Sequence, residues 1–259
     1  MENEVTEVIC KRITLLKIPI DIVKPEHLEK VVFQLLAEGK GQNIVLLSVW
    51  DLLRARRNTE YRNFVKNAAL VIPISKSLVK GCRFLLKKKP VRYMPFDFVI
   101  NLLTALEERE HSCYFLGSKK QILTKIEKNI RETFPCLRIV GRFSGSFKRH
   151  AEPIIIEAIR KASPSLLLVG KGVRSNEFWI VRNSEHLGNG LRLWCSDLFD
   201  IFAERKKHPS KTVFDLGLEW VGYCLHNPVK LLRLFPFLYY DLLLLIYKIF
   251  KRGSSKTET

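Results

Sequence analysis

Glycines follow three apolar segments of the sequence, where each segment gives way to a helical pattern. They are Gly117 after residues 113–116, Gly141 after residues 137–140, and the pair Gly170 and Gly172 after residues 166–169. Glycine at such a turn lets backbone N–H groups and a helix N-terminus approach a phosphate closely. The spacing matches neither GxGxxG nor Walker A. We therefore expect a phosphate-bearing ligand of unspecified class, the alternative being glycines that only permit tight turns.

The sequence lacks the other familiar constellations of catalytic residues. Its six histidines show neither HExxH nor HxH spacing, GxSxG is absent, and its six cysteines include no CxxC pair. These patterns would mark zinc sites and nucleophile elbows. We therefore expect no metal and no cofactor, and we expect the cysteines to be free thiols in a reducing compartment.

The elements that must hold these glycines are short apolar runs alternating with longer helical patterns. Such alternation is typical of βαβ units, and it predicts an α/β fold with a mostly parallel, Rossmann-like sheet covered by helices on both faces. Ligands of such sheets bind at the carboxyl ends of the strands, where the sequence also places Ser48 and Ser75. The expected strands are 13–22, 44–49, 69–74, 113–116, 137–140, 166–169 and 191–195, and the expected helices include 26–37, 51–66, 98–109, 120–133, 153–162 and 176–183.

The charge balance narrows the range of partners. The 259 residues include 44 Lys and Arg against 26 Asp and Glu, a net charge of +18. Such a chain is drawn to polyanions, which leaves nucleic acid, anionic lipid and phosphorylated substrates. The lysine run 87–89 has no nucleic-acid-binding signature around it, so we expect no nucleic acid. The first residues lack the apolar core of a signal peptide, which predicts a cytoplasmic location.

The C-terminal segment differs in composition from the rest. Residues 234–247 are apolar but shorter than the roughly 20 residues of a membrane span, and Pro236 and Asp241 interrupt them. Tyrosines and flanking lysines and arginines predict an anchor lying on an anionic membrane surface. The alternative is a helix docked on the protein's own core or on another subunit, so a homo-oligomer stays open. We expect an α/β domain over 1–198, a helical membrane-docking appendage over 199–252 and a disordered tail over 253–259.

Several blocks resemble one family of enzymes. Residues 166–180, LLLVGKGVRSNEFWI, look like the pattern VGxGxPKQExW, and residues 217–228, GLEWVGYCLHNP, look like GLEWLxRLxxEP. Smaller matches are FLGS at Phe115, IVGRFSGSF at Ile139 and FDIFA at Phe199. In this order they resemble the WecG/TagA/CpsF glycosyltransferases over about residues 13–233.

The resemblance implies an activity and a set of site residues. The family transfers an N-acetylmannosamine-type or related sugar from a UDP-sugar to a polyprenyl-diphosphate-linked acceptor, at the cytoplasmic face of the membrane, in surface polysaccharide biosynthesis. The expected acceptor and membrane contacts are Arg205, Lys207, Lys230 and Arg233. The expected donor-binding residues are Ser48, Ser75, Gly117, Gly141, Gly170, Gly172, Asn176 and Glu177.

The chain departs from the family pattern where a base is expected. The aspartate of the family's PDG motif falls on Ile74, and isoleucine cannot accept a proton. Asp97 is our first choice for a substitute, with Asp51, Asp197 and Asp200 as alternatives. Two interpretations follow: a divergent glycosyltransferase, or a catalytically inactive relative that acts as a membrane-associated partner or regulator of glycan assembly.

Overall fold

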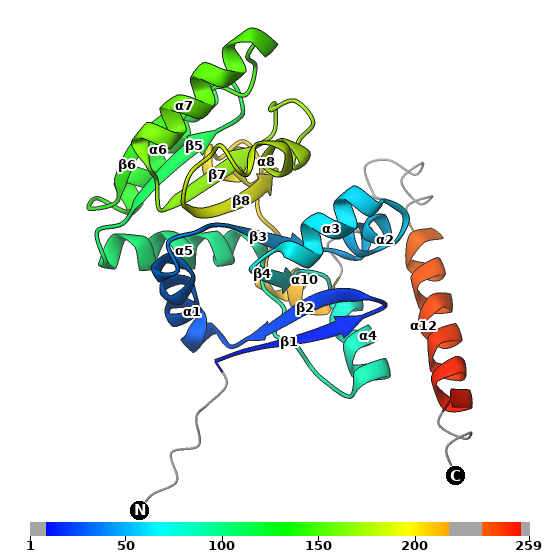
Figure 1. The fold of residues 1–259 in the computed structure, drawn as a ribbon. Coiled ribbons are helices and arrows are strands. Elements are labelled where there is room, and N and C mark those ends of the chain that lie inside the picture. The colour runs from blue at the N-terminus through cyan, green and yellow to red at the C-terminus, as the bar shows by residue number, and fades with distance from the viewer. Residues whose placement is uncertain (1–8, 218–234, 255–259) are drawn as a thin grey trace, which may run out of the picture.

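The computed structural model describes residues 9–217 and 235–254 and contains a six-stranded parallel sheet (Figure 1). The spatial order is β4-β3-β8-β7-β5-β6, and every pair of neighbours is parallel. The expected α/β fold is therefore confirmed. The strands are β3 (Gly41–Leu47), β4 (Leu70–Pro73), β5 (Ser112–Leu116), β6 (Arg138–Phe143), β7 (Leu166–Gly170) and β8 (Gly190–Ser196).

Helices cover both faces of the sheet, which explains why the inner strands β5 and β7 are buried along their whole length. One face carries α1 (Pro25–Ala37), α5 (Pro95–Glu108), α6 (Lys120–Thr133) and α9 (Leu198–Phe202). The other carries α2 (Val49–Arg57), α3 (Thr59–Asn67) and α4 (Lys76–Leu86) over β3 and β4, and α7 (Glu152–Ala162) and α8 (Phe178–Asn183) over β5 and β7. Two short helices, η1 (Arg149–Ala151) and α10 (Lys211–Leu216), lie in connections.

Two expected elements prove to be pairs. Residues 13–22 do not form one strand but belong to an antiparallel hairpin, β1 (Cys10–Leu15) and β2 (Ile18–Val23), which turns through Leu16 and Lys17 at positive φ. Residues 51–66 do not form one helix, because Asn58 ends α2 and caps α3 by accepting a hydrogen bond from the Tyr61 N–H at 2.8 Å. Both predictions were wrong at these points.

The hairpin is fixed to the sheet by one buried carboxylate. Asp21 on β2 accepts hydrogen bonds from the Val71 N–H and the Arg12 guanidinium, each at 2.7 Å. Arg12 also donates to the carbonyls of Ala68 and Ala69 just before β4. The Asp21 side chain and the hairpin together cover the edge strand β4, which would otherwise present unpaired backbone groups.

The long helix α12 (Phe235–Ser254) packs along α4 and α2. Its inner face buries Tyr240, Leu243 and Leu244, and the Tyr240 hydroxyl donates to the Ser77 carbonyl at 3.2 Å. Docking on the protein's own core, the alternative left open by the sequence, is thus observed. Among the described residues, no helix has the length and apolar character needed to cross a bilayer.

Candidate active site

The sheet has a switch point at the carboxyl ends of β5 and β7. The chain leaves β5 through α6 toward β6 on one side, and leaves β7 through α8 toward β8 on the other. Diverging connections leave a crevice between the two strand ends, and this is where open α/β sheets bind ligands. The glycine turns expected from the sequence follow these two strands.

Three of the predicted glycines meet in this crevice. Gly117 has φ +132°, and a Cβ on it would lie 2.7 Å from the Gly170 carbonyl oxygen. A further glycine, Gly145, lies equally close to the loop after β7: a Cβ on it would lie 2.7 Å from the carbonyl carbon of Gly172. The Gly145 N–H donates to the Ser118 carbonyl at 3.0 Å. The loops that follow β5, β6 and β7 therefore pack backbone against backbone at these glycines, and a side chain at Gly117 or Gly145 would force them apart. Sequence reasoning missed Gly145, although it lies inside the family-like block IVGRFSGSF.

Gly141 has a different place from the one expected. Strand β6 continues to Phe143, so Gly141 is a strand residue and the predicted turn there is wrong. A Cβ on Gly141 would lie 2.3 Å from Cε2 of Tyr114, so the glycine makes room for that ring. This close fit explains the glycine without a bound phosphate.

The structure brings Ser48 and Ser75 together at the ends of β3 and β4. The Ser75 hydroxyl accepts a hydrogen bond from the Val49 N–H at 3.2 Å, which links the two strand ends. Ile74, where the resemblance places the base, lies between them and is half-buried. Its N–H donates to the Leu47 carbonyl at 2.9 Å.

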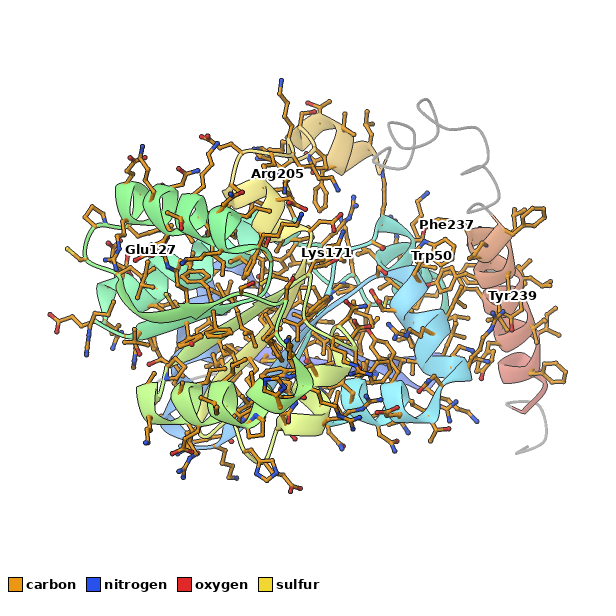
Figure 2. All side chains as sticks on the ribbon, turned by 90° about the horizontal axis from the view of Figure 1, so that it is seen from above. Trp50, Glu127, Lys171, Arg205, Phe237 and Tyr239 are labelled. Atoms are coloured by element: carbon orange, nitrogen blue, oxygen red, sulfur yellow. The ribbon has the colours of Figure 1, made fainter. Side chains whose placement is uncertain are left out.

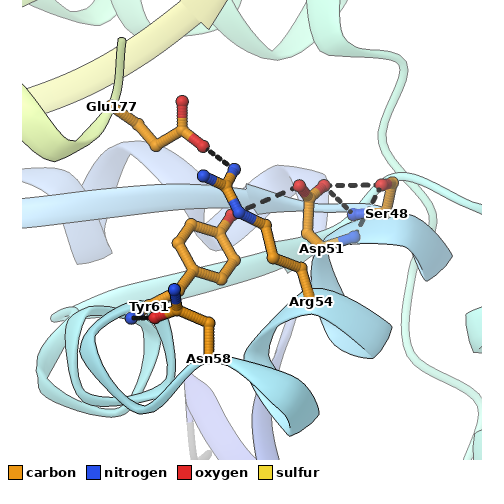
Figure 3. Close-up of polar contacts among 6 residues, drawn as sticks. All are labelled: Ser48, Asp51, Arg54, Asn58, Tyr61 and Glu177. Atoms are coloured by element: carbon orange, nitrogen blue, oxygen red, sulfur yellow. Dashed lines mark hydrogen bonds and ion pairs between the residues drawn. The ribbon is translucent and has the colours of Figure 1, made fainter. Parts of the chain in front are cut away.

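A carboxyl group lies beside these residues after all (Figure 3). Asp51, in the first turn of α2, accepts hydrogen bonds from the Ser48 N–H at 2.9 Å and from the Ser48 hydroxyl at 2.5 Å. The Tyr61 hydroxyl donates to its other oxygen at 3.2 Å. Burial raises the pKa of Asp51, and the hydrogen bonds from Ser48 oppose that rise. The result is a carboxyl group that holds its proton to a higher pH than an ordinary aspartate.

Arg54 ties this cluster to the turn before α8. Its guanidinium pairs with Glu177, which is buried, and lies 4.5 Å from the centre of the Tyr61 ring and 4.8 Å from that of Phe178. Glu177, an expected donor-binding residue, is thus joined to Asp51 through Arg54 and Tyr61. Asn176 precedes it and is exposed, with φ +51°. Arg54 and Tyr61 carried no signal in the sequence beyond a basic helical pattern.

The other candidate bases lie elsewhere on the same edge. Asp97 is exposed in the first turn of α5, just after a segment held to β4 by a 3.2 Å hydrogen bond from the Tyr93 N–H to the Pro73 carbonyl. Asp197 pairs with Lys171 and, at 2.8 Å, with Lys206. Asp200 accepts from Arg205 at 3.3 Å. Of the four carboxylates, only Asp51 belongs to the hydrogen-bonded network beside Ile74.

Exposed cations surround the crevice. Lys171 follows β7, Arg174 lies on the turn before α8, and Arg205 and Lys207 lie on the loop after α9; Figure 2 labels Lys171 and Arg205. Lys230 and Arg233 fall outside the described residues, as does the GLEW block beyond Gly217. Over 9–217 and 235–254, no group of three His, Cys, Asp or Glu side chains could hold a metal ion.

Comparisons with known proteins identify the family to which this chain belongs. The profile of the glycosyl transferase WecG/TagA/CpsF family matches residues 13–258. The chain is also similar to an N-acetylglucosaminyldiphosphoundecaprenol N-acetyl-beta-D-mannosaminyltransferase of Bacillus spizizenii, with 23% identity over 199 residues, 77% of each chain. The family profile covers the hairpin from Ile13 on, the whole sheet and α12. The chain belongs to the WecG/TagA/CpsF family and is a glycosyltransferase.

Proposed function

We propose that this enzyme transfers an N-acetylmannosamine-type or related sugar from a UDP-sugar to a polyprenyl-diphosphate-linked acceptor in surface polysaccharide biosynthesis. The observation that carries the proposal is the meeting of glycine-rich backbone loops at the carboxyl edge of the sheet, next to exposed cations. A nucleotide diphosphate needs close backbone approach and positive charge, and this edge offers both. The name of the Bacillus relative describes the same kind of transfer.

The donor diphosphate would lie over Gly117, Gly170 and Gly172. Lys171 and Arg174 would neutralise its charge and stabilise the UDP that leaves. Lys171 is already paired with Asp197, which holds the ammonium group near the crevice. The acceptor diphosphate would be met by Arg205 and Lys207, and by Lys230 and Arg233 from outside the described part. Nucleotide sugar and lipid acceptor are the substrates, and the proposal requires no nucleic acid.

Asp51 would act as the base, through Ser48. The acceptor hydroxyl would pass its proton to the Ser48 oxygen while Ser48 passes its own proton to Asp51, 2.5 Å away. The acceptor oxygen then bonds to the anomeric carbon as the bond to the UDP oxygen breaks. A raised pKa brings Asp51 closer to the operating pH, which favours general-base work. Asp97, exposed on α5, is the competing assignment.

The second candidate function is a catalytically inactive partner or regulator of glycan assembly. Ile74 favours it, because the position that the resemblance assigns to the base has no proton acceptor. Calorimetric titration of the full-length protein with UDP and a panel of UDP-sugars addresses the donor site. Saturable binding that prefers one sugar supports a working donor site. No binding of any of them by folded protein would overturn the proposed activity.

The outer face of α12 suggests where the enzyme works. Leu238, Leu242, Leu245 and Ile249 follow a helical stripe and are 52 to 67% exposed. Such a stripe, on a strongly basic protein, suits the surface of an anionic membrane. We therefore place the enzyme peripherally on the cytoplasmic face of the cell membrane.

Sedimentation with anionic vesicles tests this placement. Replacing Leu242 with aspartate should release the protein from the vesicles, whereas the same change at Ile154, an exposed apolar residue on α7, should not. A homo-oligomer joined through α12 is the competing outcome. It would appear as a concentration-dependent mass that Leu242→Asp abolishes, with no vesicle binding by the parent.

A further inference from the structure

A small apolar pocket lies beside α12, away from the glycine crevice. It has a volume of about 410 Å³ and is lined by residues 14–17 of the hairpin turn, by Leu85 and Leu86 at the end of α4, and by Ile246, Tyr247 and Phe250 of α12. The Tyr247 hydroxyl accepts a hydrogen bond from Arg56 at 3.2 Å, so its polar end is already engaged and its ring is left for the pocket. Pockets of roughly 300–1,000 Å³ hold small ligands. This one suits a hydrocarbon chain.

The rim of the pocket is basic. Lys17 lines it, and the exposed residues Lys87, Lys88 and Lys89 follow Leu86 directly. Lys248 lies over the Phe84 ring, with its Nζ 3.7 Å from the ring centre. Arg83, which is exposed near the same end of α4, adds a further cation, and α4 has no acidic residue. An apolar pocket with a positive rim is complementary to a lipid with an anionic headgroup.

The pocket is distinct from the site of the acceptor. Phe237, near the start of α12, packs edge-on against Trp50 at the carboxyl edge of the sheet, with ring centres 6.3 Å apart (Figure 2). Lys248 lies eleven residues farther along the helix, about 16 Å at the rise of an α-helix. An acceptor whose diphosphate lies at the catalytic edge therefore begins its chain far from the pocket. The geometry favours a lipid of the bilayer itself.

We infer that this pocket binds one acyl chain of an anionic phospholipid, whose headgroup phosphate rests on Lys17 and the lysines after α4. The inference rests on the membrane placement proposed above. A lipid held there would be a second contact with the bilayer, beside the exposed stripe of α12. Two contacts fix the rotation of the protein about the axis of α12. The catalytic edge of the sheet is then held at one distance from the membrane surface. A stripe alone would leave that rotation free.

Photolabelling of the full-length protein tests the inference. The probe is phosphatidylglycerol with a diazirine at the middle of one acyl chain, mixed into phosphatidylcholine vesicles, and labelled peptides are mapped after irradiation. We expect label at residues 14–17 and at Leu85 and Leu86. Label confined to the outer stripe of α12 would overturn the inference. So would a pocket labelled by a diazirine-bearing polyprenyl phosphate and not by the phosphatidylglycerol probe, or crosslinks between two copies of the chain through these residues.

A matched pair of variants completes the experiment. Leu86→Trp fills the pocket and should abolish labelling of the pocket residues, while the outer stripe of α12 is still labelled. Leu242→Trp adds the same ring on the outer face and should leave pocket labelling intact. Equal pocket labelling in both variants would contradict the assignment. Donor titration reports separately on the proposed function, since both substitutions lie away from the glycine crevice. Lost donor binding with retained labelling would overturn the activity and leave the lipid site standing.

Discussion

Replacing Tyr240 with alanine should detach α12 from the rest of the protein. Tyr240 is fully buried, and its ring occupies the space above Gly81, where a Cβ would lie only 2.0 Å from the tyrosine oxygen. Its hydroxyl donates to the Ser77 carbonyl. Helix and core therefore fit each other at this point, and the mutation removes the largest fully buried side chain among the described residues.

The size of the effect follows from burial. Truncating a buried aromatic side chain to alanine costs about 3–5 kcal/mol. Because each 1.4 kcal/mol is tenfold, the population of the detached state should rise by roughly 100- to 4,000-fold. Tyr240→Phe loses only the hydrogen bond, about 1 kcal/mol, or roughly fivefold. Leu242→Ala, on the exposed face, should change stability by less than about 0.5 kcal/mol.

Amide hydrogen exchange measures the detachment directly. Exchange of the α12 amides should accelerate in the order Leu242→Ala, Tyr240→Phe, Tyr240→Ala, since local opening controls the rate. Amides of β7 and β8, the two central strands of the sheet, should exchange as in the parent and serve as the internal control. Equal α12 exchange in the parent and in Tyr240→Ala would refute the docked arrangement.

Four further outcomes follow from the site and the fold. Asp51→Asn should lower turnover roughly 10²–10⁴-fold with unchanged UDP-sugar affinity, and a larger loss in Asp97→Asn would instead make Asp97 the base. Only the ionised form of Asp51 accepts a proton, and burial raises the pKa of this carboxyl group. The transfer rate of the parent should therefore increase with pH, with its midpoint above the ordinary aspartate pKa of about 3.9, and a rate independent of pH would count against this base. Gly117→Ala should weaken UDP binding in calorimetry, whereas unchanged binding would place the donor elsewhere. Asp21→Ala should lower the free energy of unfolding, measured in urea, by about 3 kcal/mol, because it leaves the Val71 N–H and the Arg12 guanidinium without their acceptor. A loss below about 1 kcal/mol would show that other contacts hold the hairpin.

The layered α/β fold was readable from the sequence, because strands buried on both faces must be apolar runs. The edge strand β6, which is largely exposed, was predicted only in part, because its continuous apolar run ends at Val140 while the strand continues to Phe143. The hairpin was not readable: residues 15–18 are Leu, Leu, Lys and Ile, with no glycine or asparagine to mark the turn. Leu16 and Lys17 take the left-handed conformation there, held by the packing of both strands.

The site was only partly readable. Glycines and serines at strand ends could be placed, because the carboxyl ends of parallel strands share one edge. The spacing Ser48-x-x-Asp51 is itself a helix-start signal, and the structure shows the full capping box. The link from Arg54 to Glu177 spans 123 residues, and a single sequence contains nothing that pairs them. The turn expected at Gly141 failed because two further strand residues follow that glycine.

The most direct test of the central claim is a transfer assay with the full-length protein. Purified protein is mixed with UDP-N-acetylmannosamine and polyprenyl-diphosphate-linked N-acetylglucosamine in anionic vesicles, and the lipid-linked disaccharide is measured with parent and Asp51→Asn side by side. We predict product from the parent and a large loss in the variant. No product from that donor or from other UDP-sugars, with folded and vesicle-bound parent protein, would contradict the activity and favour an inactive partner of glycan assembly.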